Sequence, residues 1–352
     1  TEIYTLSLHD ALPISMSAFQ TAFTRHAGVE VPLICGAMYP CSNPELVAAV
    51  SAAGGLGIVQ PISMRFVHGH DLRDGLRLMR QITDRPFGFN AIVEKSSDVY
   101  MDRMKRWVDV ALEEGVRFFV TALGDPRWVV DAVHAVGGVV YHDVTERKWA
   151  QKALEGGVDG LICVNARAGG HAGQKTPEKL FEELGDLGVP LVCAGGVGDE
   201  ATFARMLGLG YAGVQMGTRF IATTECKAHD DYKQAIVRAR ADEIVLTEKI
   251  SGVPVAVIET PYVKQVGTKA GVVMKRVLRH PKLKHYGRMY YSLKSVWQLK
   301  KASLEGGTYK DYFQAGKSVD GIHAIEPAGA IVKRYADAWR ASHASGAAEG
   351  AS

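Results

Sequence analysis

The sequence predicts an α/β fold, a (β/α)8 TIM barrel with a mostly helical C-terminal insertion or extension. Short apolar runs recur from Pro32 to Phe220, a segment with helical spacing follows each run, and several of these segments end in glycine. Continuous apolar runs are typical of parallel strands that are buried on both faces. We count eight such units, and eight strand–helix units favour a closed barrel over an open sheet.

The predicted strands are five to eight residues long and rich in β-branched and aromatic side chains. They span 33–38, 56–60, 87–93, 116–123, 139–144, 160–165, 189–196 and 213–220. The helices predicted between them include 43–53, with Asn43 as N-cap and Pro44 in the first turn, and 126–136, with Asp125 as N-cap. Glycines in AAGGLGI, EEGVRFF, EGGVDGL and GLGYAGV are predicted to end helices in the left-handed conformation.

The ends of the chain differ from the rest. Residues 1–15, TEIYTLSLHDALPIS, resemble a translated adapter sequence and lack the pattern of a secretory signal. We predict a non-native leader before a natural start at Met16, and a short native extension is the alternative. Residues 16–226 are predicted to form the barrel, 326–341 a closing helix that packs back on it, and 342–352 a disordered tail.

The region 227–325 is predicted to be a basic helical region that contacts substrate or forms a lid. It includes a polar helical stretch at 230–242 and a strand-like segment at 253–258. Between residues 264 and 301 there are eleven Lys or Arg residues and no Asp or Glu. One interpretation is a solvated helical face. The other is a surface for a polyanionic ligand, with Lys282 and Lys284 as phosphate contacts.

Composition excludes several classes of protein. The chain has 352 residues, of which 47% are hydrophobic and 22% charged, so disorder, collagen and coiled coil are excluded as the dominant state. No apolar run approaches the roughly 20 residues of a membrane-spanning helix. Five scattered cysteines without a CxxC pair argue against disulfides and a structural zinc site, and they favour a reducing, cytoplasmic location. No metal site is predicted.

The candidate catalytic residue is His171. In a parallel barrel the ligand lies at the carboxyl ends of the strands, so the residues after each strand are the ones that contact it. The sixth strand is followed by Ala168-Gly169-Gly170-His171, in which glycines let the backbone bring an imidazole close to a ligand. A histidine can act there as a general base or hydrogen-bond donor. The alternative is a structural or merely exposed histidine.

The last two strands predict a phosphate site. The seventh strand ends in Gly195 and Gly196, and the eighth is followed by Gly217 and Thr218. Loops with bare backbone amides at this position commonly bind phosphate in this fold, although the glycines could also serve only the turns. A phosphorylated cofactor would then place a flat ring against the first strand, at Gly36-Ala37-Met38.

These motifs occur together in one family. ICGAM, AAGGLGIV, PFGFN, AGGHAG, VCAGGVGD and VQMGTRF, in this order, resemble the FMN-dependent nitronate monooxygenase family (2-nitropropane dioxygenase-like) over residues 23–226. The resemblance implies bound FMN and His171 as the catalytic base. The cofactor-binding residues that we expect from the motifs are Ala37, Met38, Asn90, Gly170, Gly195, Gly196, Gly217 and Thr218.

The chain departs from this family at the end of the fifth strand. Many relatives carry Lys or Gln there, whereas this chain has His142 and Asp143. We expect His142 to contact substrate or phosphate. A carboxylate beside a phosphate is unfavourable, so we expect Asp143 to point elsewhere or to act on the substrate.

The resemblance implies oxidation of alkyl nitronates by dioxygen, which gives a carbonyl compound and nitrite. The alternative is an NAD(P)H-dependent flavin reductase that acts on a quinone or on an enoyl- or acyl-CoA thioester, and a third reading is a flavin-dependent sensor. Expected partners are the small-molecule substrate and O2, with no nucleic acid, because no binding motif accompanies the positive charge. The oligomeric state is not predicted.

Overall fold

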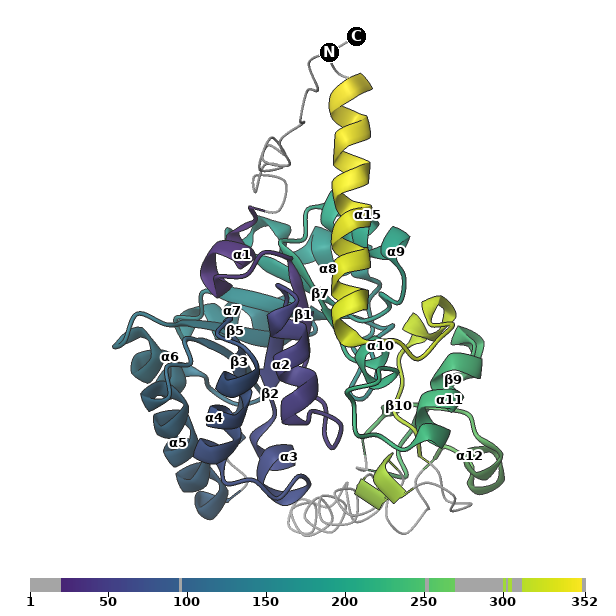
Figure 1. Ribbon diagram of the computed structural model, residues 1–352, viewed down its shortest axis with the longest axis horizontal. Helices are drawn as coiled ribbons and strands as arrows, with labels where there is room; N and C mark the ends of the chain where they lie inside the picture. The colour runs from purple at the N-terminus through teal and green to yellow at the C-terminus, as the bar shows by residue number, and fades with distance from the viewer. Residues whose placement is uncertain are drawn as a thin grey trace, which may run out of the picture.

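The computed structural model describes residues 20–94, 97–250, 253–269, 300–301, 303–305 and 312–349. Eight parallel strands form a closed barrel in sequence order, and β1 pairs with both β2 and β8 (Figure 1). The strands are β1 Leu33–Cys35, β2 Leu56–Val59, β3 Gly88–Ile92, β4 Phe118–Ala122, β5 Val139–Val144, β6 Gly160–Val164, β7 Leu191–Ala194 and β8 Gly213–Met216. The predicted TIM barrel is confirmed, and each strand lies within its predicted run.

Helices surround the barrel. They are α2 Pro44–Ala52, α3 Pro61–Phe66, α4 Leu72–Ile82, α5 Asp98–Glu113, α6 Arg127–His134, α7 Arg147–Glu155, α8 Pro177–Leu184, α9 Glu200–Leu209 and the short α10 Thr218–Ile221. The glycines predicted to end helices do so with positive φ: Gly54 at 92°, Gly115 at 82°, Gly157 at 85° and Gly210 at 116°. Most residues avoid this conformation, and glycine adopts it without a Cβ clash.

Two of the predicted helix starts differ in detail from the expected caps. Asn43 is the N-cap of α2, but its side chain donates to Glu45 Oε2 (2.7 Å) and to the Glu225 carbonyl (2.9 Å) instead of accepting from the helix. The N-cap of α6 is Pro126, and the Asp125 carboxylate accepts from the Arg127 amide at 3.1 Å. Asn43 thus connects α2 to the segment that follows the barrel.

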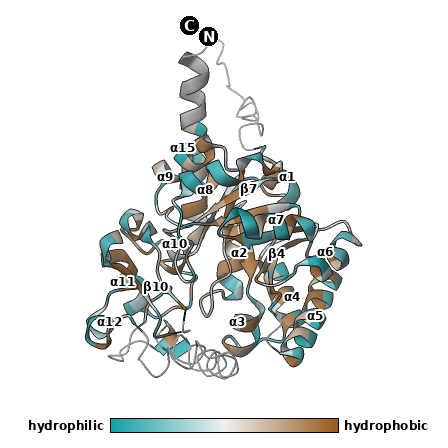
Figure 2. Ribbon diagram, turned by 180° about the vertical axis from the view of Figure 1, so that it is seen from behind, coloured by the Kyte–Doolittle hydropathy of each residue, from teal (hydrophilic) through white to brown (hydrophobic). Residues whose placement is uncertain are grey.

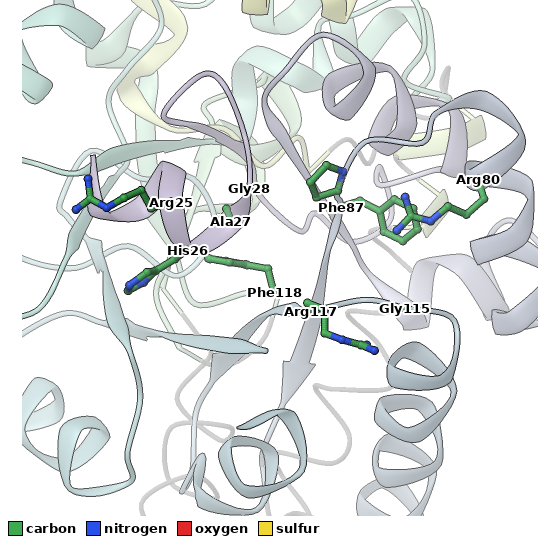
Figure 3. Close-up of a pocket in the computed structure, with 10 residues that line it drawn as sticks. Arg25, His26, Ala27, Gly28, Arg80, Phe87, Gly115, Arg117 and Phe118 are labelled. Carbon is green, nitrogen blue, oxygen red and sulfur yellow. The ribbon is translucent and has the colours of Figure 1, made fainter. Parts of the chain in front are cut away.

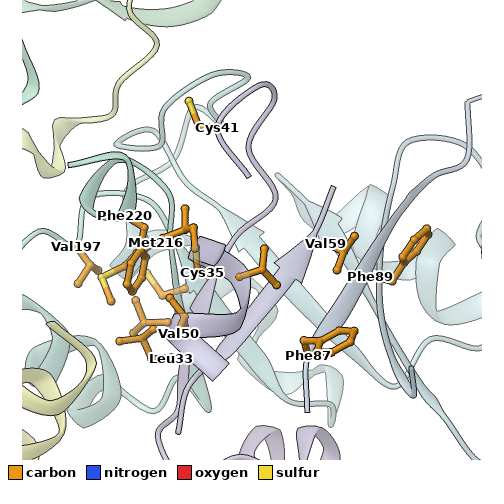
Figure 4. Packing of buried hydrophobic residues seen from close by; sticks show 14 of the residues in the cluster. Leu33, Cys35, Cys41, Val50, Val59, Phe87, Phe89, Val197, Met216 and Phe220 are labelled. Carbon is orange, nitrogen blue, oxygen red and sulfur yellow. The ribbon is translucent and has the colours of Figure 1, made fainter. Parts of the chain in front are cut away.

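Alternate residues of each strand belong to two different apolar clusters. One cluster fills the barrel interior and includes Ile34, Ile58, Phe118, Tyr141, Ile162 and Val192. The other lies between the strands and the helices and includes Leu33, Cys35, Val59 and Phe89 (Figure 4). Successive side chains of a strand point to opposite faces of the sheet. Membership in one of the two clusters therefore shows whether a strand position faces the barrel interior or the helices. Brown apolar residues accordingly concentrate on the central strands in Figure 2.

Helix α1, Ala22–Ala27, closes the amino-terminal end of the barrel, and the sequence did not predict it. Phe23 is fully buried, with its ring centroid 5.7 Å from that of Phe118 and 6.1 Å from that of Tyr141. A pocket of about 320 Å³ opens beside this helix (Figure 3). Its lining includes Arg25, His26, Arg80, Phe87, Arg117 and Phe118.

The described part of 227–325 combines helices with a two-stranded antiparallel sheet. Its elements are α11 Asp230–Arg238, η3 Ala241–Glu243, β9 Ile244–Thr247, β10 Val255–Ile258, α12 Pro261–Val266 and η4 Lys317–Gly321. They lie together at the lower right of Figure 1, whereas α1 lies near the opposite end. Lys282 and Lys284 are outside the described residues, as is most of the basic stretch 264–301.

The final helix, α15 Ala328–Glu349, packs against α9 and α2. Its buried residues include Ile331 and Tyr335, and the Tyr335 ring meets Phe203 edge-on at 5.4 Å. The expected disordered tail from 342 is wrong as far as Glu349, because the helix continues. Residues 342–349 contain no proline, so no residue of this segment lacks the backbone N–H that a helix uses. Residues 1–15 and 350–352 are outside the described residues.

Within the described part, no helix has the length and apolarity needed to cross a membrane.

Candidate active site

The inner wall of the barrel carries three polar residues near the carboxyl ends of the strands. Asn90 of β3, Asp143 of β5 and Gln215 of β8 share a face with interior residues of their own strands or neighbours. The Asn90 amide donates to the Val120 carbonyl at 3.3 Å. A Cβ on Gly36 would lie 3.0 Å from the Gln215 side chain, so Gln215 occupies the space beside the end of β1. Gln215 was not among the residues predicted from the sequence, although strand alternation from Gly213 identifies it as inward-facing.

His171 lies in the loop between β6 and α8, and this loop is fastened at several points. The Asn165 carbonyl accepts from the Gly173 amide at 3.1 Å, and a Cβ at Gly173 would overlap the carbonyl oxygen of Val164. Gly170, with φ 66°, forms a bridge with β10, where the Ala256 amide donates to its carbonyl at 2.8 Å. The backbone that carries His171 is therefore fixed by glycines and by the β9–β10 sheet.

The His171 side chain is solvent-exposed, yet it stands in a crowded part of the protein. This partial loss of solvation lowers the pKa of His171 below its ordinary value. The imidazole is therefore neutral at neutral pH, which is the form that accepts a proton.

The turn after β7 is narrow and leaves backbone donors available. Gly195 and Gly196 have φ of 114° and 81°, and a Cβ on Gly196 would lie 2.6 Å from Arg167 Nε. Gly196 is buried, and neither its N–H nor that of Gly195 makes a hydrogen bond within the described part of the chain. Buried N–H groups nearly always have a partner, so this turn is suited to an anion.

The turn after β8 also presents backbone N–H donors to a ligand. The N–H groups of Gly217 and Thr218 also have no acceptor among residues that the structure describes. The Thr218 hydroxyl oxygen accepts from the Gly316 amide at 3.0 Å, which leaves its own hydrogen free to donate. Lys317 N donates to the Arg167 carbonyl at 2.9 Å, so two cationic residues stand beside the glycine turns. The segment around Gly316 was not predicted from the sequence as part of the site.

The ring contacts predicted at Ala37 and Met38 follow β1 and lie beside this turn. Ala37 and Met38 are half-buried. The Met38 amide donates to Ser42 Oγ at 2.8 Å, and a Cβ on Gly217 would lie 3.3 Å from Met38 Sδ. The Met38 side chain is thus available to contact a ligand, whereas its backbone amide is already hydrogen-bonded to Ser42.

The structure corrects the expectation for His142. Tyr141 of the same strand faces the interior, whereas Val140 and Val144 face the helices. His142 shares their outward face, is 5% exposed, and its Nδ1 lies 2.8 Å from Thr121 Oγ1. Burial lowers its pKa to about 4. His142 therefore supports the barrel wall, and Asp143 is the residue of this pair that faces the interior.

Comparison with known proteins identifies the family. The sequence model described as nitronate monooxygenase matches residues 20–336. The chain belongs to the nitronate monooxygenase family. Members and relatives of this family are flavin-dependent oxidoreductases, and this family member is an oxidoreductase.

Its relatives carry out different reactions. A Rhodococcus jostii protein named (3aS,4S,5R,7aS)-5-hydroxy-7a-methyl-1-oxo-octahydro-1H-indene-4-carboxyl-CoA dehydrogenase is 30% identical over 262 residues, 73% of this chain and 72% of that protein. A nitronate monooxygenase of Pseudomonas aeruginosa is 30% identical over 273 residues, 65% of this chain and 77% of that protein. The structure of FabK from Thermotoga maritima is similar with a TM-score of 0.74 and 28% identity, covering 93% of this chain and 98% of that chain.

The residues present fit a flavin mononucleotide. Four backbone N–H groups that have no acceptor among the described residues lie on the β7 and β8 turns, with the Thr218 hydroxyl beside them. This donor set matches a phosphate group. Asn90 and Gln215 face the barrel interior, where their amide groups can hydrogen-bond the polar edge of a ring.

Proposed function

We propose that this family member binds FMN and oxidises alkyl nitronates with O2, giving a carbonyl compound and nitrite. The observation that carries the proposal is the set of backbone donors at Gly195, Gly196, Gly217 and Thr218, at the end of the barrel where His171 lies. The family match over residues 20–336 supports the same reaction.

In this proposal the four amides and Thr218 hold the cofactor phosphate, and Ala37 and Met38 contact the ring. The bound flavin supplies the electron transfer. Neutral His171 takes the carbon-bound proton when a neutral nitroalkane is offered, and its N–H stabilises the anion when a nitronate is offered. The β9–β10 sheet keeps the histidine loop in position through its bridge to Gly170.

A second candidate is an NAD(P)H-dependent flavin enzyme that acts on an acyl- or enoyl-CoA thioester. It is favoured by the named CoA dehydrogenase of Rhodococcus jostii and by the eleven-to-zero excess of cationic over acidic residues between 264 and 301. Lys and Arg side chains commonly bind phosphate groups such as those of CoA. The same FMN site and the same histidine would serve this reaction.

The experiment that separates the candidates is anaerobic mixing of the purified, oxidised protein with propionate 3-nitronate alone, NADH alone or NADPH alone. Loss of flavin absorbance with the nitronate supports the first candidate. Rapid loss with a pyridine nucleotide, followed by reoxidation with an enoyl-CoA, supports the second. A protein that binds no flavin after incubation with FMN contradicts both.

A further inference from the structure

Asp143 is placed on the inner wall of the barrel, at the end where the strands terminate. Its strand neighbour Tyr141 faces the interior, and its Cα partner on β6, Ile162, belongs to the interior cluster as well. Asp143 is one inward position closer than Tyr141 to the carboxyl end of β5, Val139–Val144. The carboxyl group therefore faces the space over which the ligand is proposed to lie.

Within the described part of the chain, no cationic group contributes to the pKa of this carboxyl group, and burial is the cause of its shift. Its Oδ1 atom is buried, and no donor within the described part of the chain reaches that atom. Tyr141 lies beneath it, Ile162 beside it, and the nearby thiol of Cys163 faces the other side of the sheet. Burial raises the pKa of Asp143 to about 7, so the neutral acid is well populated at neutral pH.

Buried polar atoms without a protein partner are rare, and one that faces a ligand site is expected to bond the ligand. An ionised carboxylate would repel an anionic substrate, and its buried Oδ1 atom would have no hydrogen-bond donor among the described residues. A neutral carboxylic acid instead provides an O–H donor, and hydrogen bonds to a charged acceptor are among the stronger ones.

We propose that Asp143, in its protonated form, donates a hydrogen bond to the oxygen of a carbon-conjugated oxyanion in the substrate. A nitronate and the enolate of a thioester both present this chemistry, so the assignment applies to either candidate reaction. It rests on the proposed function, because it requires the ligand to occupy this end of the barrel. His171 and Asp143 then have separate tasks: the histidine handles the carbon-bound proton, and the acid binds the oxygen.

The assignment has a consequence for proton uptake. A substrate anion that accepts a hydrogen bond from Asp143 stabilises its protonated form, so binding above pH 7 takes up a proton from solvent. Among the described residues, the titratable groups near Asp143 are Tyr141 beneath it and Cys163 on the neighbouring strand, and His171 lies at the same end of the barrel. All three remain in an Asp143→Asn variant, so a difference between that variant and the wild type reports on Asp143.

The test compares wild-type holoenzyme with Asp143→Asn, which keeps a donor but cannot ionise, and Asp143→Leu, which has neither property. Asp102→Asn, at an exposed position on α5, is the matched control. Anaerobic binding of propionate 3-nitronate and of acetoacetyl-CoA is followed by the visible spectrum of the flavin from pH 6 to 9, with a pH indicator in weak buffer.

We expect the wild-type Kd of the bound probe to rise, relative to Asp143→Asn, by about tenfold per pH unit above 7. Proton uptake should occur in the wild type and in Asp102→Asn, and be lost in Asp143→Asn. Asp143→Leu should bind the probe at least about tenfold more weakly at every pH with unchanged FMN content. The probe that binds identifies nitronate or enolate as the ligand.

Three results overturn the assignment while leaving FMN binding intact. They are identical pH profiles and proton uptake in wild type and Asp143→Asn, unchanged affinity in Asp143→Leu, and binding of neither probe to a flavin-replete enzyme. A wild-type protein that does not bind FMN contradicts the proposed function, and with it the assignment.

Discussion

Arg219 and Glu326 form an ion pair with a nitrogen–oxygen distance of 3.4 Å, which joins the end of the last barrel strand to the segment before α15. The Arg219 side chain is 1% exposed. It also donates to the Ala222 carbonyl at 3.0 Å and to the Ala324 carbonyl at 2.9 Å. The buried guanidinium of Arg219 thus holds the segment before α15 against the barrel.

Arg219→Ala is expected to lower the free energy of unfolding by about 3 kcal/mol, because it removes a buried charged side chain together with its packing and its hydrogen bonds to the Ala222 and Ala324 carbonyls. Chemical denaturation measures this loss. Arg205→Ala is the control, because its pair with Glu178 is exposed and such pairs contribute less than about 1 kcal/mol. Equal losses in the two variants would contradict a special role for Arg219.

His171→Ala is expected to retain FMN and to lower turnover by at least about 100-fold, because the variant has no group at this position to accept or donate a proton. Flavin absorbance and steady-state rates with each candidate substrate measure the two effects. His134→Ala is the control, since His134 pairs with Asp159 at 2.8 Å on the protein surface. Full activity in a flavin-replete His171→Ala enzyme would remove the histidine from the reaction.

Gly196→Ala is expected to weaken FMN binding by at least about tenfold. The new Cβ meets Arg167 at 2.6 Å and strains the turn that presents the amides, which corresponds to about 1–3 kcal/mol. Gly188→Ala is the matched control, because Gly188 also has positive φ, 73°, but has open space around it. Fluorescence titration of free FMN gives the two affinities, and similar values would argue against a cofactor role for this turn.

The buried His142 predicts a loss of stability in acid. Its folded-state pKa of about 4 lies below the ordinary value of 6.5, so only the unfolded chain gains a proton as pH falls through this window. The contribution of His142 to stability is therefore complete above pH 6.5 and falls by about 3 kcal/mol by pH 4. His142→Gln should flatten this part of the profile relative to the wild type. Denaturation midpoints measured at a series of pH values test this prediction. Parallel profiles of the wild type and His142→Gln would contradict it.

The barrel could be predicted from the sequence because its signals are local. Apolar runs and helix-ending glycines such as Gly54 and Gly210 occur within a few residues of the elements that they define. Helix α1 was missed because its six residues carry too short a pattern to indicate a helix. Its role depends on Phe23 meeting Phe118 and Tyr141 from distant parts of the chain.

The candidate site was only partly predictable, for two physical reasons. A strand that is buried on both faces has no polar side, so hydropathy could not show that His142 faces outward and Asp143 inward. Long-range contacts also could not be predicted from the sequence. The Gly316 amide, for example, donates to Thr218 Oγ1, which is 98 residues away in the sequence. Glycine turns after β7 and β8, by contrast, were readable because the fold fixes where strand ends meet.

Strand β10 uses both of its edges. One edge pairs with β9, and the other takes a bridge from Gly170 through Ala256 and a second bridge from Gln314 through Val257. Strand β10 therefore joins three segments: the loop that carries His171, strand β9, and the segment around Gln314. We expect a sequence change in the hairpin to shift the loop that carries His171 through the Gly170–Ala256 bridge, without any change in the eight barrel strands.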